Sequence, residues 1–118
     1  MCEVPRVGKA GIGIQLYVMS HEVTHNEARR RFEWEEGGHT AHLDYVRRED
    51  RILLVHTEVP EALAGRGLGG TLAKAALDYA RANELAVVPK CPFVASYLVR
   101  HPEYQDLVRP EDRVYLID

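Results

Sequence analysis

The chain has 118 residues, of which 46% are hydrophobic and 28% are charged, and its formal net charge at pH 7 is -3. This length and composition fit one globular domain and exclude a disordered chain. The charge gives no sign of nucleic-acid binding, and no apolar run approaches the roughly 20 residues of a membrane span. Two cysteines, Cys2 and Cys91, argue against a disulfide framework and favour the cytoplasm.

A second methionine sets the first residues apart from the rest. Residues 1–18 precede Met19, and a polar stretch follows it. We expect a single domain over residues 19–118. Residues 1–18 are then an extension, either natural or upstream of the true start.

The segment "HEVTH", His21 to His25, matches the H-E-x-x-H motif of zinc hydrolases. That motif works because two histidines four residues apart share one face of a helix. The β-branched Val23 and Thr24, with Asn26 directly after, disfavour a helix. His39 and His42 are available as further ligands, but we expect no metal here.

Three strand patterns follow and predict an antiparallel meander. They lie at residues 29–36, 39–48 and 51–59. In the first, Phe32 and Trp34 share one face, and the glycine pair 37–38 then marks a turn. The third is apolar and β-branched enough for a central strand.

From Leu68 onward the apolar residues recur at helical spacing, and Asn83 marks the end of that helix. Residues 85–89 predict a short strand. Because a helix joins it to residues 51–59, we expect these two strands to be parallel neighbours.

Pro92 suits the first turn of a short helix that ends at His101 and Pro102. The tail is expected to form a turn or short helix and then a last strand over Arg113–Ile117. Together the elements predict an α/β (α+β) fold, with a mixed, mainly antiparallel sheet flanked by helices.

Between the predicted central strand and the helix lies a glycine-rich loop. Gly65, Gly67, Gly69 and Gly70 fall within six residues, with Arg66 and Thr71 among and after them. Glycines allow close approach of the backbone to a ligand, and the first amides of a helix attract anions. From the residues alone, an anion site and tight packing of the helix on the sheet fit equally well.

Two nucleotide-binding motifs fail at this loop. A Walker loop needs a lysine directly before Thr71, where the chain has Gly70. A dinucleotide fingerprint needs the first strand of a parallel unit, whereas this loop follows three antiparallel strands.

The segment from His56 to Tyr104 resembles the GNAT superfamily of acetyl-CoA-dependent N-acetyltransferases. The superfamily's pyrophosphate loop has Gln or Arg, two residues, Gly, one residue, then Gly or Ala. Gly67 and Gly69 match it, whereas Ala64 replaces the Gln or Arg. The stretches "HTEVP", "GRGLGG" and "CPFVASYLVRHPEY", with "RRRFE" before them, look like the small YidJ-type members. The resemblance covers roughly residues 23–108.

This resemblance implies binding of acetyl-CoA or coenzyme A as cosubstrate, without a metal. Loop amides hold the pyrophosphate in that superfamily, and the strand before the loop offers its exposed edge to the pantetheine. Carried over, the cofactor-binding residues are Glu58, Val59, Gly65, Arg66, Gly67, Leu68, Gly69, Gly70, Thr71 and Cys91. The substitution at Ala64 removes one side-chain contact to phosphate.

Cys91 falls between a predicted strand and the N-terminus of a predicted helix, next to Lys90. A helix N-terminus and a nearby cation both favour the reactive thiolate. Position alone favours an inert, buried cysteine, whereas the resemblance favours a reactive one near the thiol of CoA. Cys91 could then take the acetyl group covalently and pass it on.

The alternative route is direct attack of the amine on acetyl-CoA. His56 and Glu58 are two residues apart on a strand, so they share a face and are candidate bases. The resemblance implies a tyrosine that protonates the departing CoA thiolate, for which Tyr97 and Tyr104 are candidates. Taken singly, each residue also fits a structural role.

We therefore expect a cytoplasmic N-acetyltransferase whose catalytic residues come from Cys91, His56, Glu58 and Tyr97. Its acceptor is a small-molecule or protein amine, with no nucleic-acid or membrane partner. One alternative is a CoA- or acyl-CoA-binding module without turnover, because the N-terminal helices that usually shape a GNAT acceptor site are not evident. The remote alternative is the zinc hydrolase.

Overall fold

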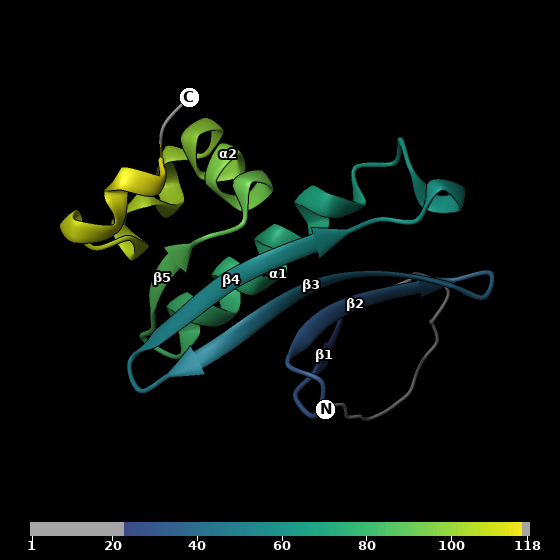
Figure 1. The fold of residues 1–118 in the computed structure, drawn as a ribbon, viewed down its shortest axis with the longest axis horizontal. Coiled ribbons are helices and arrows are strands. Elements are labelled where there is room, and N and C mark those ends of the chain that lie inside the picture. Colours follow the sequence, from purple (N-terminus) through teal and green to yellow (C-terminus); the bar gives the residue numbers. More distant parts are fainter. Residues whose placement is uncertain (1–22, 117–118) are drawn as a thin grey trace, which may run out of the picture.

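The structure, a computed structural model, describes residues 23–116. Its strands are β1 (Thr24–Asn26), β2 (Arg31–Glu36), β3 (His39–Arg48), β4 (Arg51–Glu58) and β5 (Ala86–Pro89), and its helices are α1 (Leu68–Ala82) and α2 (Pro92–Arg100). The 3-10 helices are η2 (Glu61–Leu63), η3 (Pro102–Leu107) and η4 (Pro110–Tyr115). The strands form one sheet in the order β1-β2-β3-β4-β5, parallel at β4–β5 and antiparallel elsewhere (Figure 1). The expected mixed, mainly antiparallel sheet with helices is confirmed.

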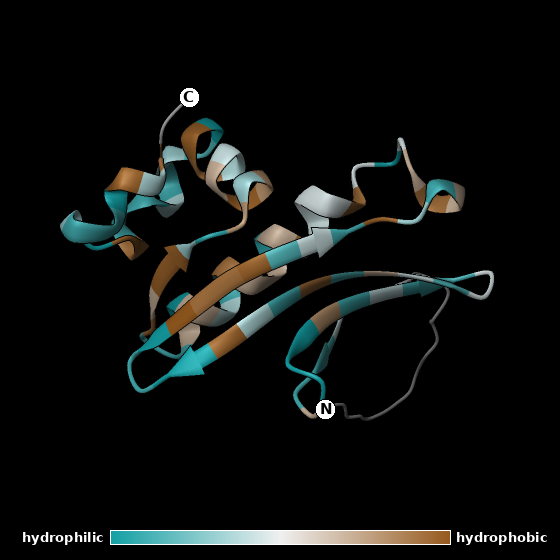
Figure 2. Cartoon of the chain, in the orientation of Figure 1, coloured by the Kyte–Doolittle hydropathy of each residue, from teal (hydrophilic) through white to brown (hydrophobic). Residues whose placement is uncertain are grey.

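The core lies between the sheet and α1, which runs behind it in Figure 1. Leu43 and Leu54 of the sheet and Leu72 and Leu77 of α1 are fully buried. Burial of each such side chain stabilises the fold by about 1.5–3 kcal/mol. The hydrophobic colouring of β5 and of the middle of β4 in Figure 2 contrasts with the hydrophilic turn between β3 and β4. In the described part of the chain, no helix covers the opposite face of β2 and β3.

Both ends of α1 follow from the sequence. Gly67 precedes it in the left-handed region, at φ 74°, and Asn83 is its C-cap. The predicted parallel pairing of β5 with β4 and the predicted first-turn position of Pro92 in α2 are confirmed.

The predicted last strand, Arg113–Ile117, is wrong within the described residues. Pro110–Tyr115 forms the 3-10 helix η4 instead. Its bonds are local, from the Asp112 amide to the Arg109 carbonyl at 2.9 Å and from the Leu116 amide to the Arg113 carbonyl at 2.9 Å. These turns satisfy the backbone without a strand partner, and η4 packs near β5.

A bulge in β4 decides which way its last side chains point. Asp44 pairs with His56, but the next β3 residue, Tyr45, pairs with Leu54, so β4 has one extra residue. Leu54 and Thr57 therefore face α1 together, although they are three positions apart. His56 and Glu58 face the open side of the sheet.

Strand β4 extends beyond its parallel neighbour. The β4–β5 pairs end at Leu54 with Pro89, and the Cys91 amide then donates to the Leu54 carbonyl at 2.8 Å. Residues 55–58 continue to Glu58 with only β3 as a partner among the described strands. The two strands therefore diverge at Leu54, and a stretch of β4 backbone edge is left without a strand beside it.

The extension predicted at residues 1–18, Met19 and His21 lie outside the described residues. His25 lies in β1, not in a helix, and pairs with Phe32 of β2. Because its second histidine lies in a strand, this segment does not form a helical H-E-x-x-H site. Among the described residues, no helix has the length and apolarity needed to cross a membrane.

Candidate functional site

A pocket of about 310 Å³ opens where β4 ends and α1 begins. It is lined by Thr57, Val59, Leu63, Ala64, Gly65, Gly67, Leu68, Gly69, Gly70 and Phe93. The end of β4 supplies one wall, the loop the second and the start of α2 the third. Six predicted cofactor-binding residues line this pocket, namely Val59, Gly65, Gly67, Leu68, Gly69 and Gly70. Glu58, Arg66, Thr71 and Cys91 are not among its lining residues.

The loop over residues 64–71, here the glycine loop, presents its backbone to this pocket. Gly65 and Gly67 have φ values of 80° and 74°, and a Cβ built at either would meet no atom within 4 Å. Neither glycine is therefore required by packing, but both are required by conformation. The amides of Leu68 and Gly69 lie in the first turn of α1, where no intrahelical carbonyl is available to them. This backbone, with the positive end of the helix dipole, fits an anionic group.

The two polar side chains of the glycine loop make contacts within the protein. Arg66 donates to Glu36 of β2 at 2.9 Å, and both side chains are partly exposed. The Thr71 hydroxyl donates to the Gly67 carbonyl at 3.2 Å and so closes the first turn of α1. Arg66 can therefore reach a phosphate only by leaving Glu36, whereas Thr71 acts on the loop itself.

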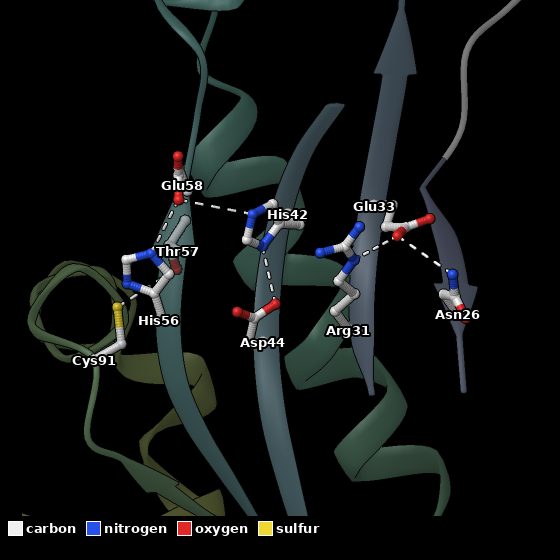
Figure 3. A network of polar contacts seen from close by, with 9 residues as sticks. All are labelled: Asn26, Arg31, Glu33, His42, Asp44, His56, Thr57, Glu58 and Cys91. Atoms are coloured by element: carbon white, nitrogen blue, oxygen red, sulfur yellow. Dashed lines mark hydrogen bonds and ion pairs between the residues drawn. The ribbon is translucent and has the colours of Figure 1, made fainter. Parts of the chain in front are cut away.

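Cys91 is buried, with 4% of its surface exposed. Its sulfur lies 3.4 Å from the hydroxyl of Thr57, which lines the pocket (Figure 3). No basic or cationic side chain contacts this sulfur among the described residues. The thiol thus lies directly behind the pocket wall, at the point where β4 and β5 diverge.

Four titratable side chains meet on the open face of the sheet, here the histidine–carboxylate cluster (His42, Asp44, His56 and Glu58; Figure 3). His56 Nε2 lies 3.3 Å from Glu58 Oε1, and His42 Nε2 lies 3.8 Å from the same oxygen. His42 Nδ1 lies 2.9 Å from Asp44 Oδ1. The predicted pair His56 and Glu58 is therefore adjacent, and β3 adds two groups to it.

The two candidate proton donors differ in position. Tyr97 of α2 packs against Gly70 in the first turn of α1, and burial raises the pKa of its hydroxyl, which therefore stays protonated. Tyr104 instead donates to Asp78 Oδ1 at 2.7 Å, about two turns further along α1. A hydrogen bond to Asp78 raises the pKa of Tyr104 and engages its proton. Tyr97 is thus closer to the pocket than Tyr104.

Sequence reasoning did not single out Thr57, Phe93 or Asp44, and considered His42 only as a metal ligand. The position of Thr57 could not be predicted because the bulge reverses the face to which it points. Phe93 directly follows Pro92, which starts α2, so its place in the first turn of that helix was predictable. His42 and Asp44 have the i, i+2 spacing of a strand face, and this signal was available. Among the described residues, no group of three or more His, Cys, Asp or Glu side chains is arranged to hold a metal ion.

The pocket and the histidine–carboxylate cluster lie in a segment that the chain shares with known proteins. The family model described as GCN5-related N-acetyl-transferase matches residues 31–107. Over 94 residues the chain is 36% identical to Protein NATD1 of Gallus gallus, spanning 75% of this chain and 86% of that protein. Over 90 residues it is 39% identical to Protein NATD1 of Mus musculus, spanning 74% and 82%. The same identity over 90 residues is found with Protein NATD1 of Homo sapiens, spanning 74% and 80%. The matched segment contains the pocket and the histidine–carboxylate cluster, while the YidJ-type subgroup stays a prediction.

Proposed function

Because the chain belongs to the GCN5-related N-acetyltransferase family, we propose that it binds acetyl-CoA and transfers the acetyl group to an amine. The observation that carries this proposal is the pocket between the free end of β4 and the glycine loop. It combines an unpaired strand edge, which suits the amides of a pantetheine arm, with helix amides that suit a pyrophosphate.

In this proposal the backbone provides most of the binding. Amides from Gly65 to Gly70 face the pyrophosphate, whereas the Thr71 amide donates to the Gly67 carbonyl at 3.1 Å. The backbone of Glu58 and Val59 pairs with the pantetheine. Arg66 exchanges Glu36 for a phosphate oxygen. Ala64 offers no side-chain contact, so the affinity depends on the loop conformation that Gly65 and Gly67 permit.

Acetyl-CoA supplies an activated thioester when bound. Glu58, whose side chain is 63% exposed, removes a proton from the acceptor amine on the open face of the sheet, with His56 beside it. The hydroxyl of Tyr97 supplies a proton to the CoA sulfur as it leaves. The pocket lies on the α1 side of the sheet and the acceptor on the open face. The thioester must therefore lie in the gap where β4 and β5 diverge, where the amine can reach it.

We propose the direct route in preference to an acetylated Cys91. A thiol attacks as the thiolate, and Cys91 is buried with a threonine hydroxyl as its side-chain partner. His56 and Glu58 face away from it across β4. Cys91 then serves to fill the junction of β4 and β5 behind Thr57.

Calorimetry with CoA and acetyl-CoA tests binding, and release of CoA thiol with a panel of small amines and lysine peptides tests transfer. We expect dissociation constants below the millimolar range and amine-dependent thiol release. Mass spectrometry should find no acetyl group on Cys91, and Cys91→Ala should retain transfer. Binding without release by any amine would favour the CoA-binding module, and no binding would remove the proposal.

The acceptor is proposed to be a small-molecule or protein amine, and neither nucleic acid nor membrane is part of the proposal. A cytoplasmic location is proposed from the two-cysteine composition.

A further inference from the structure

We propose that His42, held by Asp44, is a positioning residue that takes up the proton which Glu58 removes from the amine and, as an imidazolium, then holds Glu58 in place. This inference rests on the proposed function. It concerns β3, a strand that lines no part of the pocket.

The backbone register brings the four groups of the histidine–carboxylate cluster together. His42 pairs directly with Glu58, and Asp44 pairs directly with His56. Directly opposed residues of antiparallel strands have Cβ atoms about 4.5–5.5 Å apart and share a face. The result is two adjacent rows, each with one histidine and one carboxylate. The proximity of their Cβ atoms therefore does not depend on side-chain rotamers.

Asp44 determines which nitrogen of His42 carries the proton. A carboxylate accepts hydrogen bonds, so at 2.9 Å from Asp44 Oδ1 the Nδ1 atom is the protonated one. In the neutral ring, Nε2 then carries a lone pair, 3.8 Å from Glu58 Oε1. A lone pair and a carboxylate do not attract each other, whereas a proton placed between them binds both. A small approach of the two side chains from 3.8 Å would therefore place one proton between them.

Exposure separates the roles of the two histidines. The side chain of His42 is 17% exposed, whereas those of His56 and Glu58 are 57% and 63% exposed. Glu58 is open to an incoming acceptor, and His42 lies beside it on β3, less exposed. The carboxylate facing His42 from β2 is Glu33, which accepts hydrogen bonds from Arg31 and Asn26 and so does not compete for the ring.

The proton balance is simple. An N–H bond of the acceptor ammonium breaks as an O–H bond forms at Glu58. That O–H bond then breaks as an N–H bond forms at Nε2 of His42, which leaves an imidazolium between Asp44 and Glu58. The neutral amine attacks the thioester carbon and the C–S bond breaks, with the proton of Tyr97 going to the CoA sulfur. The second amine proton is released to solvent, from which Tyr97 takes a proton back, and His42 returns its proton to solvent after the product leaves.

The first test uses the protein without any substrate. Nitrogen-15 NMR of the histidine side chains, with His42→Gln to assign the ring, reports the tautomer of His42. We expect the Nδ1–H form in the wild type and a shift toward the Nε2–H form in Asp44→Ala. His39→Gln, at the exposed start of the same strand, is the control and should leave the His42 signals unchanged. An Nε2–H form in the wild type would overturn the proposal.

The second test is kinetic, with acetyl-CoA and the amine that gives the fastest thiol release. His42→Gln should lower kcat by about 100-fold, in the range of general-base effects, and alter its pH profile. KM for acetyl-CoA should change less than about twofold, because the pocket is intact. An unchanged kcat would overturn the role of His42. So would a fall in kcat accompanied by a rise in KM and a lower melting temperature, because that would indicate a structural defect. Failure of the wild type to bind acetyl-CoA or release thiol would instead remove the proposed function, and with it this role, whatever the tautomer.

Discussion

At the scale of single residues, Gly69 shows how packing between the helices shapes the pocket. A Cβ at Gly69 would lie 2.8 Å from Cζ of Phe93, closer than such atoms approach. At Gly70 the nearest atom, in the ring of Tyr97, would be 3.4 Å away. Phe93 lines the pocket and is 39% exposed, so its ring can turn toward solvent. The absence of a side chain at Gly69 thus leaves room for the ring of Phe93 at the pocket.

Substitution of Gly69 should therefore affect binding more than folding. Gly69→Ala should lower the affinity for acetyl-CoA by up to about tenfold, because the ring of Phe93 must move. Its free energy of unfolding should change by less than about 1 kcal/mol, because the higher helix propensity of alanine offsets the packing that the displaced ring of Phe93 loses. Calorimetry and urea unfolding measure the two quantities. Gly70→Ala, where the nearest ring atom would be 3.4 Å away, should lower the affinity less than Gly69→Ala does. Equal losses of affinity in the two variants would contradict this role of Phe93.

At the scale of elements, the glycine loop is tied to the end of β2 through Arg66 and Glu36. Trp34 also donates to Glu36 Oε1, at 3.1 Å, so one carboxylate oxygen receives two donors. A partly exposed ion pair of this kind is worth about 0–1 kcal/mol. Arg66 can thus leave Glu36 at little cost when a phosphate arrives.

This exchange predicts opposite effects for the two partners. Glu36→Gln should raise the affinity for CoA by up to roughly fivefold, because Arg66 no longer has a competing carboxylate. Arg66→Glu should weaken binding by about 1–3 kcal/mol, and the loss should shrink at high salt. Calorimetry at low and high salt measures both effects. Normal affinity in Arg66→Glu would mean that this side chain faces solvent in the complex.

The sequence predicted most elements and the glycine loop because their signals are local. Glycine spacing, helical period and Pro92 each determine the structure within a few residues. The bulge after Leu54 is a property of two paired strands, so the α1-facing position of Thr57 could not be predicted from β4 alone. The predicted strand in the tail was wrong for a related reason. The apolar run after Arg113 does not show whether a partner strand is available, and this segment forms η4, which packs near β5.

At the scale of the whole molecule, the two faces of the sheet have separate tasks. The face against α1 carries the core and leads to the pocket, and the open face carries the histidine–carboxylate cluster. The divergence of β4 and β5 at Leu54 connects the two faces. At the other end of the sheet, β1 is held by His25, which stacks on Phe32 at 4.3 Å and bonds to the hydroxyl of Tyr45 at 2.6 Å. This aromatic contact fixes the sheet edge to α1 through Tyr79.

The stability of the whole domain should therefore depend on the charge of His25. Burial lowers the pKa of His25 below its ordinary value of 6.5, and nearby Glu27 only partly opposes this. The unfolded chain then binds the proton first, so this stability is fully present above about pH 6.5 and is lost as the pH falls toward the folded value. Urea unfolding at about pH 8 and about pH 5.5 should show it, and His25→Gln should lose less free energy over that interval than the wild type. His39→Gln, which removes an exposed histidine, should keep the wild-type difference. An identical pH dependence in His25→Gln and the wild type would show that β1 is held without regard to the charge of this ring.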